Sequence, residues 1–287
     1  MSTSSSTVAV VGAGIAGLSA AIRLAVAGKK VIVFEQNTYT GGKVTAFEKK
    51  GFRFDMGPSL FTLPYLVDEL FELAGKNPRD YFNYHTHDEV CRYFWDDGTK
   101  LTLYPKITKN EAAVASVFGA TEGEKLRNYF EQARVKYDLT APFFLEKSLH
   151  RIGTFLTPAV MKVLKEVPKL GLFSTLHEEN EKVFDAPKLV QLFNRYATYN
   201  GSSPYQTPGI MQMITHLEHS LGTHFPVGGM HEISQSLTRL AKELGVHFEL
   251  GTRVEEFIIM QKSITGLVAG GKKWAVDQLV CNTDVKH

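Results

Sequence analysis

The sequence has few cysteines and little net charge. Its 287 residues include two cysteines, Cys91 and Cys281, which lie far apart and outside any CxxC pair or Cys/His cluster. This scarcity excludes a disulfide framework and leaves no pattern for a zinc site, so no bound metal is expected. Lys and Arg number 32 against 30 Asp and Glu, which gives a formal charge of +2. Binding to a nucleic-acid backbone needs a concentrated basic surface, so nucleic acid is not an expected partner.

Long apolar runs are also missing. The nearly uncharged run from Val8 is interrupted by Arg23, before it reaches the about 18 residues that a membrane-spanning helix needs. Residues 1–7 lack the positive charges of a secretory signal. We therefore expect a globular cytoplasmic protein, and at about 150 residues per domain the length favours two domains.

What is present is a βαβ pattern near the N-terminus. Residues 7–11 predict a strand buried on both faces, residues 18–27 predict a helix that ends at Gly28, and residues 31–34 predict a second buried strand. Between the first strand and the helix lies the sequence Gly-Ala-Gly-Ile-Ala-Gly, residues 12–17. A GxGxxG motif alone is a weak signal, but this strand-loop-helix context is typical of a dinucleotide site.

Each residue type in this pattern has a physical reason. Gly12 permits the tight turn, Gly14 lets the backbone approach a pyrophosphate, and Gly17 brings the helix close to the strand. Glu35 ends the second strand 18 residues after Gly17, near the about 20 expected of a ribose-binding acid. Because a carboxylate would repel a 2′-phosphate, NADP is disfavoured.

The rest of the chain departs from simple βαβ alternation. Residues 44–60 look extended, residues 63–74 look helical, and a hairpin is predicted from 91–95 and 100–104 around Asp97-Gly98. Residues 110–225 are mainly helical, with Thr157-Pro158 and Thr207-Pro208 predicted to start helices. A helix over 230–244 and a strand over 246–250 then resume the αβ pattern. We infer an α/β, Rossmann-like domain, residues 1–75 and 226–287, interrupted by a mixed antiparallel-sheet and helical domain, residues 76–225.

FAD and NAD domains share the first glycine loop, so later residues must distinguish them. An NAD domain usually continues with further βαβ units. This chain instead runs through Gly41-Gly42-Lys43 into Phe54-Asp-Met-Gly-Pro-Ser59. A second glycine pair with a cation suits a longer ligand with a second contact surface.

The order of these motifs resembles the FAD-dependent carotenoid desaturases of the phytoene desaturase type, relatives of the flavin amine oxidases. The motifs are Gly12-x-Gly-x-x-Gly17, Glu35, Gly41-Gly-Lys43, Phe54-Asp-x-Gly-Pro-Ser59 and Phe225-Pro-x-Gly-Gly-Met230. The resemblance covers essentially the whole chain and implies an FAD-binding domain of the glutathione reductase type. Family members continue past the segment 280–284, so the chain is expected to be an N-terminal portion.

The resemblance also implies which residues contact FAD. In order of the cofactor's parts, they are Gly12, Ala13, Gly14, Ile15, Ala16 and Gly17 at the pyrophosphate, Glu35 and Gln36 at the adenosine ribose, Gly41, Gly42 and Lys43 along the phosphate and ribityl region, Gly57, Pro58 and Ser59 near the flavin, and Val254 at the adenine through its backbone. The family often has arginine where this chain has Lys43. Lysine keeps the charge but lacks the bidentate fork.

The implied function is desaturation of a carotenoid, such as phytoene or a later acyclic or 1-hydroxylated carotenoid, by hydride transfer to FAD. No catalytic acid, catalytic base or electron acceptor can be named from the sequence. The alternatives are another FAD enzyme, such as an amine oxidase or a retinoid saturase, or a non-catalytic dinucleotide-binding fragment. The amine oxidase alternative predicts a polar or aromatic-caged amine site, whereas residues 76–225 are interpreted as an aromatic, mainly helical insertion.

Two further features concern the substrate. Residues 154–173 predict an amphipathic helix with apolar flanks, and the stretch 147–173 carries five cations against one anion. Such a stretch can lie on a membrane surface or pack as an ordinary surface helix, and a water-insoluble polyene favours peripheral membrane association. Aromatic residues could line an apolar tunnel or pack as ordinary core: Phe61, Tyr65, Phe193, Tyr196, Tyr199 and Tyr205.

Overall fold

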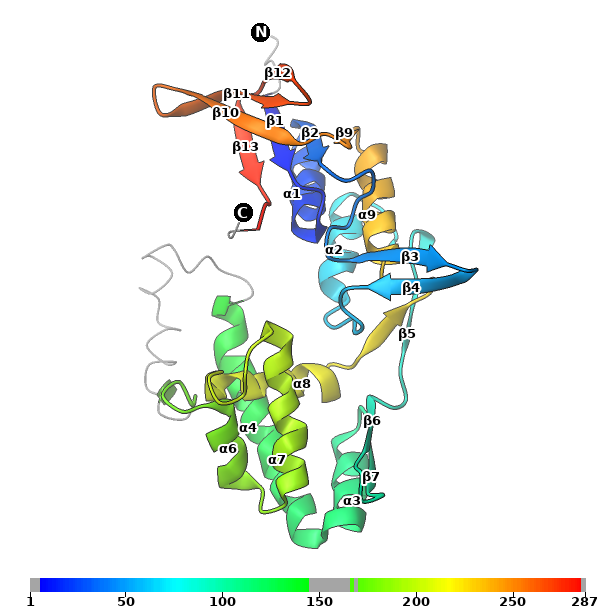
Figure 1. Ribbon diagram of the computed structural model, residues 1–287, viewed down its shortest axis with the longest axis vertical. Helices are drawn as coiled ribbons and strands as arrows, with labels where there is room; N and C mark the ends of the chain where they lie inside the picture. The colour runs from blue at the N-terminus through cyan, green and yellow to red at the C-terminus, as the bar shows by residue number, and fades with distance from the viewer. Residues whose placement is uncertain (1–5, 145–165, 168–169, 285–287) are drawn as a thin grey trace. The chain divides into compact units, whose positions relative to one another are not determined.

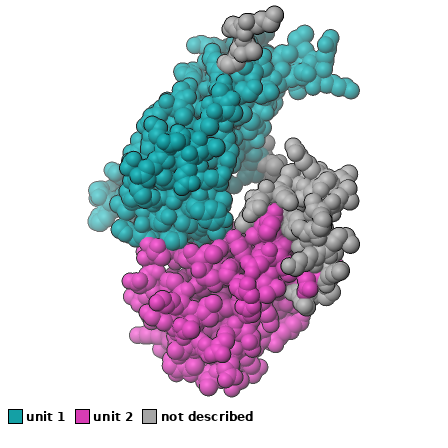
Figure 2. Space-filling model, turned by 180° about the vertical axis from the view of Figure 1, so that it is seen from behind, with its two compact units in different colours: residues 1–85, 224–287 teal, residues 86–223 magenta. Residues whose placement is uncertain are grey.

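The computed structural model describes residues 6–144, 166–167 and 170–284 (Figure 1). The chain divides into two compact units, coloured separately in Figure 2. The first unit comprises residues 1–85 and 224–287, and the second comprises residues 86–223. Residues 76–85 and 224–225, which were predicted to lie in the second domain, thus belong to the first unit.

A four-stranded parallel sheet lies at the centre of the first unit, in the order β13-β1-β2-β9. Its strands are β1 (Thr7–Val11), β2 (Lys30–Glu35), β9 (His247–Leu250) and β13 (Gln278–Cys281). Val10 and Val33 point into one apolar cluster, while Ile32 and Phe34 point into another on the opposite face. Both faces are therefore covered, which explains why β1 and β2 read as continuous apolar runs.

Helices cover one face of this sheet and antiparallel strands cover the other (Figure 1). The helices are α1 (Ile15–Val26), α2 (Tyr65–Leu73) and α9 (Glu232–Glu243). On α9, Ile233, Leu237 and Leu240 are buried in the apolar cluster that also contains Val10 and Val33. The antiparallel strands are β10 (Val254–Met260), β11 (Ser263–Ala269) and β12 (Lys272–Ala275).

Two smaller strand pairs complete the first unit. The segment predicted to be extended forms a hairpin of β3 (Thr45–Lys49) and β4 (Phe52–Met56). After α2 and the short 3-10 helix η1 (Pro78–Asp80), β5 (Tyr84–Thr86) pairs with β8 (His224–Pro226). Phe82 and Tyr84 pack around Phe61, so this segment joins the first core.

The second unit combines a hairpin with a group of helices. The hairpin, β6 (Cys91–Phe94) and β7 (Lys100–Leu103), turns at the predicted Asp97-Gly98. The helices are α3 (Ile107–Phe118), α4 (Ala120–Phe144), α6 (Leu176–Val183), α7 (Pro187–Asn194), η4 (Arg195–Asn200), η5 (Gly209–Met213) and α8 (Ile214–His219). Their shared core is rich in aromatic side chains, among them Tyr129, Phe130 and Phe193.

Two predicted helix starts differ from the structure. The first helix begins at Ile15 rather than Leu18, inside the glycine motif. Thr207 does not cap an α-helix: a 3-10 helix follows, its N-cap is Pro208, and no side chain caps it. The Thr207 carbonyl instead accepts a hydrogen bond from Leu176 N–H at 2.7 Å, which draws this segment toward α6. The predicted start at Thr157-Pro158 lies outside the described residues.

Candidate functional site

The three glycines of the loop after β1 have three different structural roles. Gly12 has a φ of +98°, and a Cβ there would lie 2.9 Å from the Asn282 carbonyl oxygen. A Cβ on Gly17 would overlap the Gly12 carbonyl oxygen, so Gly17 lets α1 approach the loop. Gly14 has an ordinary φ of −69°, and in the described structure a Cβ there would meet a single neighbour, Asn282 Nδ2, at 3.1 Å. The fold thus requires glycine at 12 and 17, whereas position 14 leaves open space beside bare backbone.

The N-terminus of α1 faces this space without a competing side chain. Gly14 is the N-cap residue and provides no side-chain cap, and the first turn of α1 carries no acidic residue. The first N–H groups of a helix lack partners within the helix, and the helix dipole adds positive potential there. Free amides together with the space at Gly14 suit an anion such as a dinucleotide diphosphate.

The second glycine pair packs directly against the first loop. Gly41 N–H donates to the Ala13 carbonyl at 2.8 Å, and Gly41 forms an isolated bridge with Gly14. A Cβ on Gly42 would lie 3.3 Å from the Gly14 Cα. Both glycines have positive φ values, +116° and +58°. The structure therefore brings together the two glycine motifs that the sequence analysis singled out separately.

Polar side chains of α9 hold the second glycine loop in place. Thr238 and Thr40 share a hydrogen bond of 2.8 Å between their hydroxyls, and Ser234 Oγ donates to the Val44 carbonyl at 2.9 Å. His231 Nε2 lies 3.1 Å from the Thr40 carbonyl. The sequence analysis missed these residues. The sequence feature that could have indicated them is the spacing of Ser234 and Thr238, because hydroxyl residues four apart lie on one face of a helix.

Glu35 ends β2 next to the glycine loop and is almost fully buried. Its Oε2 accepts a hydrogen bond from Ala13 N–H at 2.8 Å, and its Oε1 accepts from Asn37 N–H at 2.9 Å and from Asn37 Nδ2 at 2.8 Å. The carboxylate is thus fixed by three donors. The Glu35 carbonyl accepts from Thr252 N–H at 2.8 Å, which brings the segment before Val254 beside Glu35. Gln36 is exposed.

Lys43 extends from the second glycine loop into solvent, and its side chain is 90% exposed. Its Nζ donates to Asp284 Oδ2 at 2.9 Å. This hydrogen bond and the charge of Asp284 raise the pKa of Lys43 above its usual value. Lys43 therefore carries a full positive charge beside the glycine loops, with a partner from the segment that follows β13.

The segment 57–59 leaves β4 close to the second glycine loop. A Cβ on Gly57 would overlap the Lys43 carbonyl oxygen, so glycine is needed for this approach. Pro58 and Ser59 are exposed. Asp55 accepts hydrogen bonds from Met230 N–H at 3.0 Å and His231 N–H at 3.4 Å. The turn that carries Gly228 and Gly229 is thereby tied to β4.

The charge of Asp55 is stabilised by these contacts. Partial burial would raise the pKa of Asp55, but hydrogen bonds from Met230, Arg53 and His231 outweigh it and lower the pKa below its usual value. A Cβ on Gly229 would overlap the guanidinium of Arg53. Asp55 and Arg53 therefore hold the Gly228-Gly229 turn in a shape that only a small residue permits.

Comparison with known proteins agrees with this geometry. The sequence profile of the flavin containing amine oxidoreductases matches residues 15–287. The chain belongs to this family. The members of this family contain a flavin, in agreement with the expected FAD cofactor.

Two curated relatives refine the comparison within the family. The chain is 47% identical over 276 residues to the 1-hydroxycarotenoid 3,4-desaturase of a Flavobacterium species, covering 96% of the chain and 56% of the relative. It is 32% identical over 280 residues to the 4,4′-diaponeurosporene oxygenase of Staphylococcus aureus, covering 96% of the chain and 55% of the relative. The resemblance to carotenoid desaturases is confirmed. The chain spans about half the length of the curated relatives it matches.

A solved structure confirms the fold class of this flavoprotein chain. A putrescine oxidase mutant superimposes with a TM-score of 0.63 at 17% identity, covering 96% of this chain and 57% of the other. At this identity the likeness shows the fold alone. The expected Rossmann-like α/β architecture is therefore confirmed.

Not all predicted site residues are brought together by contacts. Ala13, Gly14, Gly41 and Gly42 lie against one another, as shown above, and Ile15 and Ala16 begin α1. Val254 begins β10 and its side chain packs against the apolar cluster beneath the sheet. The FAD contacts predicted for these residues, and for Gln36, Pro58 and Ser59, stay predictions.

The six aromatic residues considered for a tunnel differ widely in exposure. Phe61, Phe193 and Tyr196 are buried in the two cores. Tyr65 and Tyr205 are exposed, and Tyr199 is 39% exposed. Ordinary packing therefore accounts for Phe61, Phe193 and Tyr196. The basic stretch 154–173 lies mostly outside the described residues.

A buried polar cluster in the second unit was missed by the sequence analysis. Glu218 is fully buried, and its carboxylate accepts hydrogen bonds from Arg195 Nη2 at 2.9 Å, Tyr196 Oη at 2.9 Å and Tyr199 Oη at 2.5 Å. Burial lowers the pKa of the neighbouring His219 to about 4, so this imidazole is neutral at pH 7. The residues come from η4 and α8, and no local spacing in the sequence joins them.

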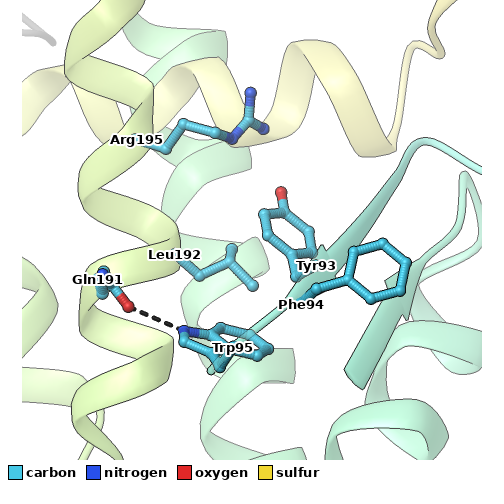
Figure 3. A pocket seen from close by; sticks show the side chains of 6 residues that line it. All are labelled: Tyr93, Phe94, Trp95, Gln191, Leu192 and Arg195. Atoms are coloured by element: carbon cyan, nitrogen blue, oxygen red, sulfur yellow. Dashed lines mark hydrogen bonds between the residues drawn. The ribbon is translucent and has the colours of Figure 1, made fainter. Parts of the chain in front are cut away.

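Arg195 also lines an open pocket of about 240 Å³ in the second unit, with Tyr93, Phe94, Trp95, Gln191 and Leu192 (Figure 3). Two of these side chains are joined by a hydrogen bond, which Trp95 Nε1 donates to Gln191 Oε1 at 2.8 Å. Within the described structure, Tyr93 Oη and Arg195 Nε are buried without hydrogen-bond partners of their own. Burial raises the pKa of Tyr93, so its hydroxyl keeps its proton.

The described residues offer neither a metal-binding cluster nor a membrane-spanning helix. They contain no group of three or more His, Cys, Asp or Glu side chains that could hold a metal ion. None of the helices formed by these residues is both long and apolar enough to cross a membrane.

Proposed function

We propose that the complete protein is an FAD-dependent desaturase that removes hydrogen from an acyclic carotenoid, with a 1-hydroxylated carotenoid as the favoured substrate. The observation that carries this proposal is the 47% identity over 276 residues with a 1-hydroxycarotenoid 3,4-desaturase. The alignment covers 96% of the chain, so it extends through both units. The dinucleotide geometry of the first unit supports the cofactor part of the proposal.

We assign the parts of the site to parts of FAD. Gly12–Gly17 surround the diphosphate, Glu35 and Gln36 border the adenosine ribose, and Gly41–Lys43 follow the phosphates and the ribityl chain. Gly57–Ser59 run near the flavin, and the Val254 backbone lines the adenine. Three features support this assignment. The free amides of α1 and the cation of Lys43 attract an anion, and the space at Gly14 gives the anion room.

The chemistry divides between cofactor and protein. When bound, FAD would accept the hydride that leaves an sp³ carbon of the substrate, and loss of a proton from the neighbouring carbon would complete the new double bond. An acyclic carotenoid has few polar groups with which the protein could form hydrogen bonds. The residues of the chain therefore contribute by binding the cofactor in a fixed orientation and by excluding water from the polyene.

We also propose that the protein attaches peripherally to a membrane to collect its substrate. A carotenoid is insoluble in water and resides in the bilayer. The stretch 147–173, with five cations against one anion, supports attachment to a surface of anionic lipids.

Pigment analysis tests the proposed function. The complete coding sequence is expressed in hosts that accumulate phytoene, a later acyclic carotenoid or a 1-hydroxylated carotenoid, with a Gly14→Val version as the matched control. We expect a product with a longer conjugated system and two fewer hydrogen atoms in at least one host, and none with the control. No new product from any of the three, together with peroxide release from amines, would establish the amine oxidase alternative instead.

A further inference from the structure

The residue that follows β13 lies beside the first glycine loop. β13 runs parallel to β1, and Cys281 pairs with Val11 at the ends of the two strands. Asn282 N–H donates to the Val11 carbonyl at 2.8 Å. Asn282 is therefore placed next to Gly12 at the carboxyl edge of the sheet, where open α/β sheets bind their ligands.

Asn282 adjoins all three glycines of the loop. A Cβ on Gly12 would lie 2.9 Å from the Asn282 carbonyl oxygen, and a Cβ on either Gly14 or Gly17 would lie 3.1 Å from Asn282 Nδ2. Nδ2 also donates a long hydrogen bond of 3.5 Å to the Gly12 carbonyl. This is the one hydrogen bond that the Asn282 side chain makes in the described structure. The second N–H of the amide thus remains available on the side of the loop where Gly14 leaves space.

We propose that Asn282 is a binding residue for the diphosphate of FAD. One amide N–H keeps the Gly12 carbonyl in place, and the other is a donor for the anion that the space at Gly14 admits. An amide suits both tasks because it is neutral and carries two N–H groups on one nitrogen. This proposal rests on the proposed dinucleotide site and adds to it a residue from the far end of the chain.

The chemistry separates this role from simple support of the loop. An aspartate at position 282 has nearly the same shape but carries no N–H group. Its negative charge would face both the Gly12 carbonyl and the diphosphate. A purely supporting side chain would affect ligands with and without phosphate equally, whereas a diphosphate contact would affect phosphate-bearing ligands selectively.

The test compares ADP and adenosine by calorimetric titration of the purified apo-protein. These two probes share the nucleoside and differ by the diphosphate. We expect Asn282→Asp to weaken ADP binding at least 30-fold and to leave adenosine binding within 3-fold, and Asn282→Ala to weaken ADP binding about 5-fold. The matched control is Gln278→Glu, which adds the same charge to the exposed amino end of the same strand and should leave both affinities unchanged.

Each contrary result has a distinct meaning. Equal losses for ADP and adenosine with Asn282→Asp would show that Asn282 only supports the loop, and unchanged affinities would show that it has no role in binding. Either result overturns the proposal while leaving the dinucleotide site intact. If the unmodified protein bound neither FAD nor ADP, the dinucleotide assignment itself would fall, and this proposal with it.

Discussion

At the scale of single residues, the sequence motif groups glycines that the structure separates by role. The three glycines of the GxGxxG pattern look alike in the sequence. In the structure, the backbone geometry requires glycine at positions 12 and 17 but not at position 14. Asn282, which lies 270 positions beyond Gly12, contacts the same loop through its side chain. No local pattern could reveal that contact, because it is created by the pairing of β13 with β1.

Glu35 provides a test at this scale. All three hydrogen bonds to its carboxylate come from N–H donors of Ala13 and Asn37. A glutamine offers only one oxygen, so its NH₂ group would face either Ala13 N–H or Asn37 N–H. We therefore expect Glu35→Gln to lower FAD affinity about tenfold and to destabilise the apo-protein by about 1 kcal/mol, the usual cost of an unsatisfied buried donor.

The measurement is FAD titration by flavin fluorescence together with urea unfolding of the apo-protein. Glu48→Gln serves as the control, because it makes the same change at an exposed glutamate of β3 outside the proposed FAD contacts. Wild-type affinity and wild-type stability in Glu35→Gln would mean that the carboxylate is not the acceptor described here.

At the scale of elements, the long periodic segments were predictable and the connections between them were not. The strands β1 and β2, the helices α2 and α9 and the β6-β7 hairpin follow from apolar periodicity and turn residues. The N-terminus of α1 was misplaced by three residues because glycine and alanine carry almost no periodic signal. The start predicted at Thr207 was wrong: a 3-10 helix with Pro208 as its N-cap follows, and the Thr207 carbonyl accepts a hydrogen bond from Leu176 N–H.

The tie between β4 and the Gly228-Gly229 turn gives a pH-dependent prediction. The pKa of Asp55 is lower in the folded protein than in the unfolded chain. Its carboxylate therefore stabilises the fold fully above the unfolded pKa of about 4, and this contribution is lost as the pH falls through the folded pKa. We expect Asp55→Asn to destabilise the protein by about 1 kcal/mol at pH 7, since hydrogen bonds to a charged group are lost.

Urea unfolding of the wild type and Asp55→Asn at several pH values checks this. The difference between the two proteins should shrink steadily below pH 4, once the wild-type carboxyl is protonated. A difference that stayed constant down to pH 3 would mean that the charge of Asp55 contributes nothing. The matched control is Asp88→Asn, which makes the same change at an exposed aspartate.

At the scale of the whole molecule, the sequence yielded the family and the discontinuous first unit, but not the interior of the second. The first unit could be predicted from the sequence because its motifs are local and its strands are buried on both faces. The cluster around Glu218 depends on residues from η4 and α8 that meet only through tertiary packing. From the sequence, the aromatic residues of the second unit could belong to a core or to a tunnel. The structure places Phe193 and Tyr196 in the core.

The central claim is that Gly14 leaves room for the diphosphate of FAD, and one measurement addresses it directly. The Gly14→Val variant of the full-length protein is purified beside the wild type, and the ratio of flavin to protein absorbance is recorded with the melting temperature of each apo-protein. A Cβ at position 14 meets the side-chain amide of Asn282 rather than backbone, so we expect the fold to tolerate valine there, while the ligand should lose its place. We predict a soluble, colourless variant whose apo melting temperature is within a few degrees of the wild type. A yellow variant with one flavin per chain would contradict the account.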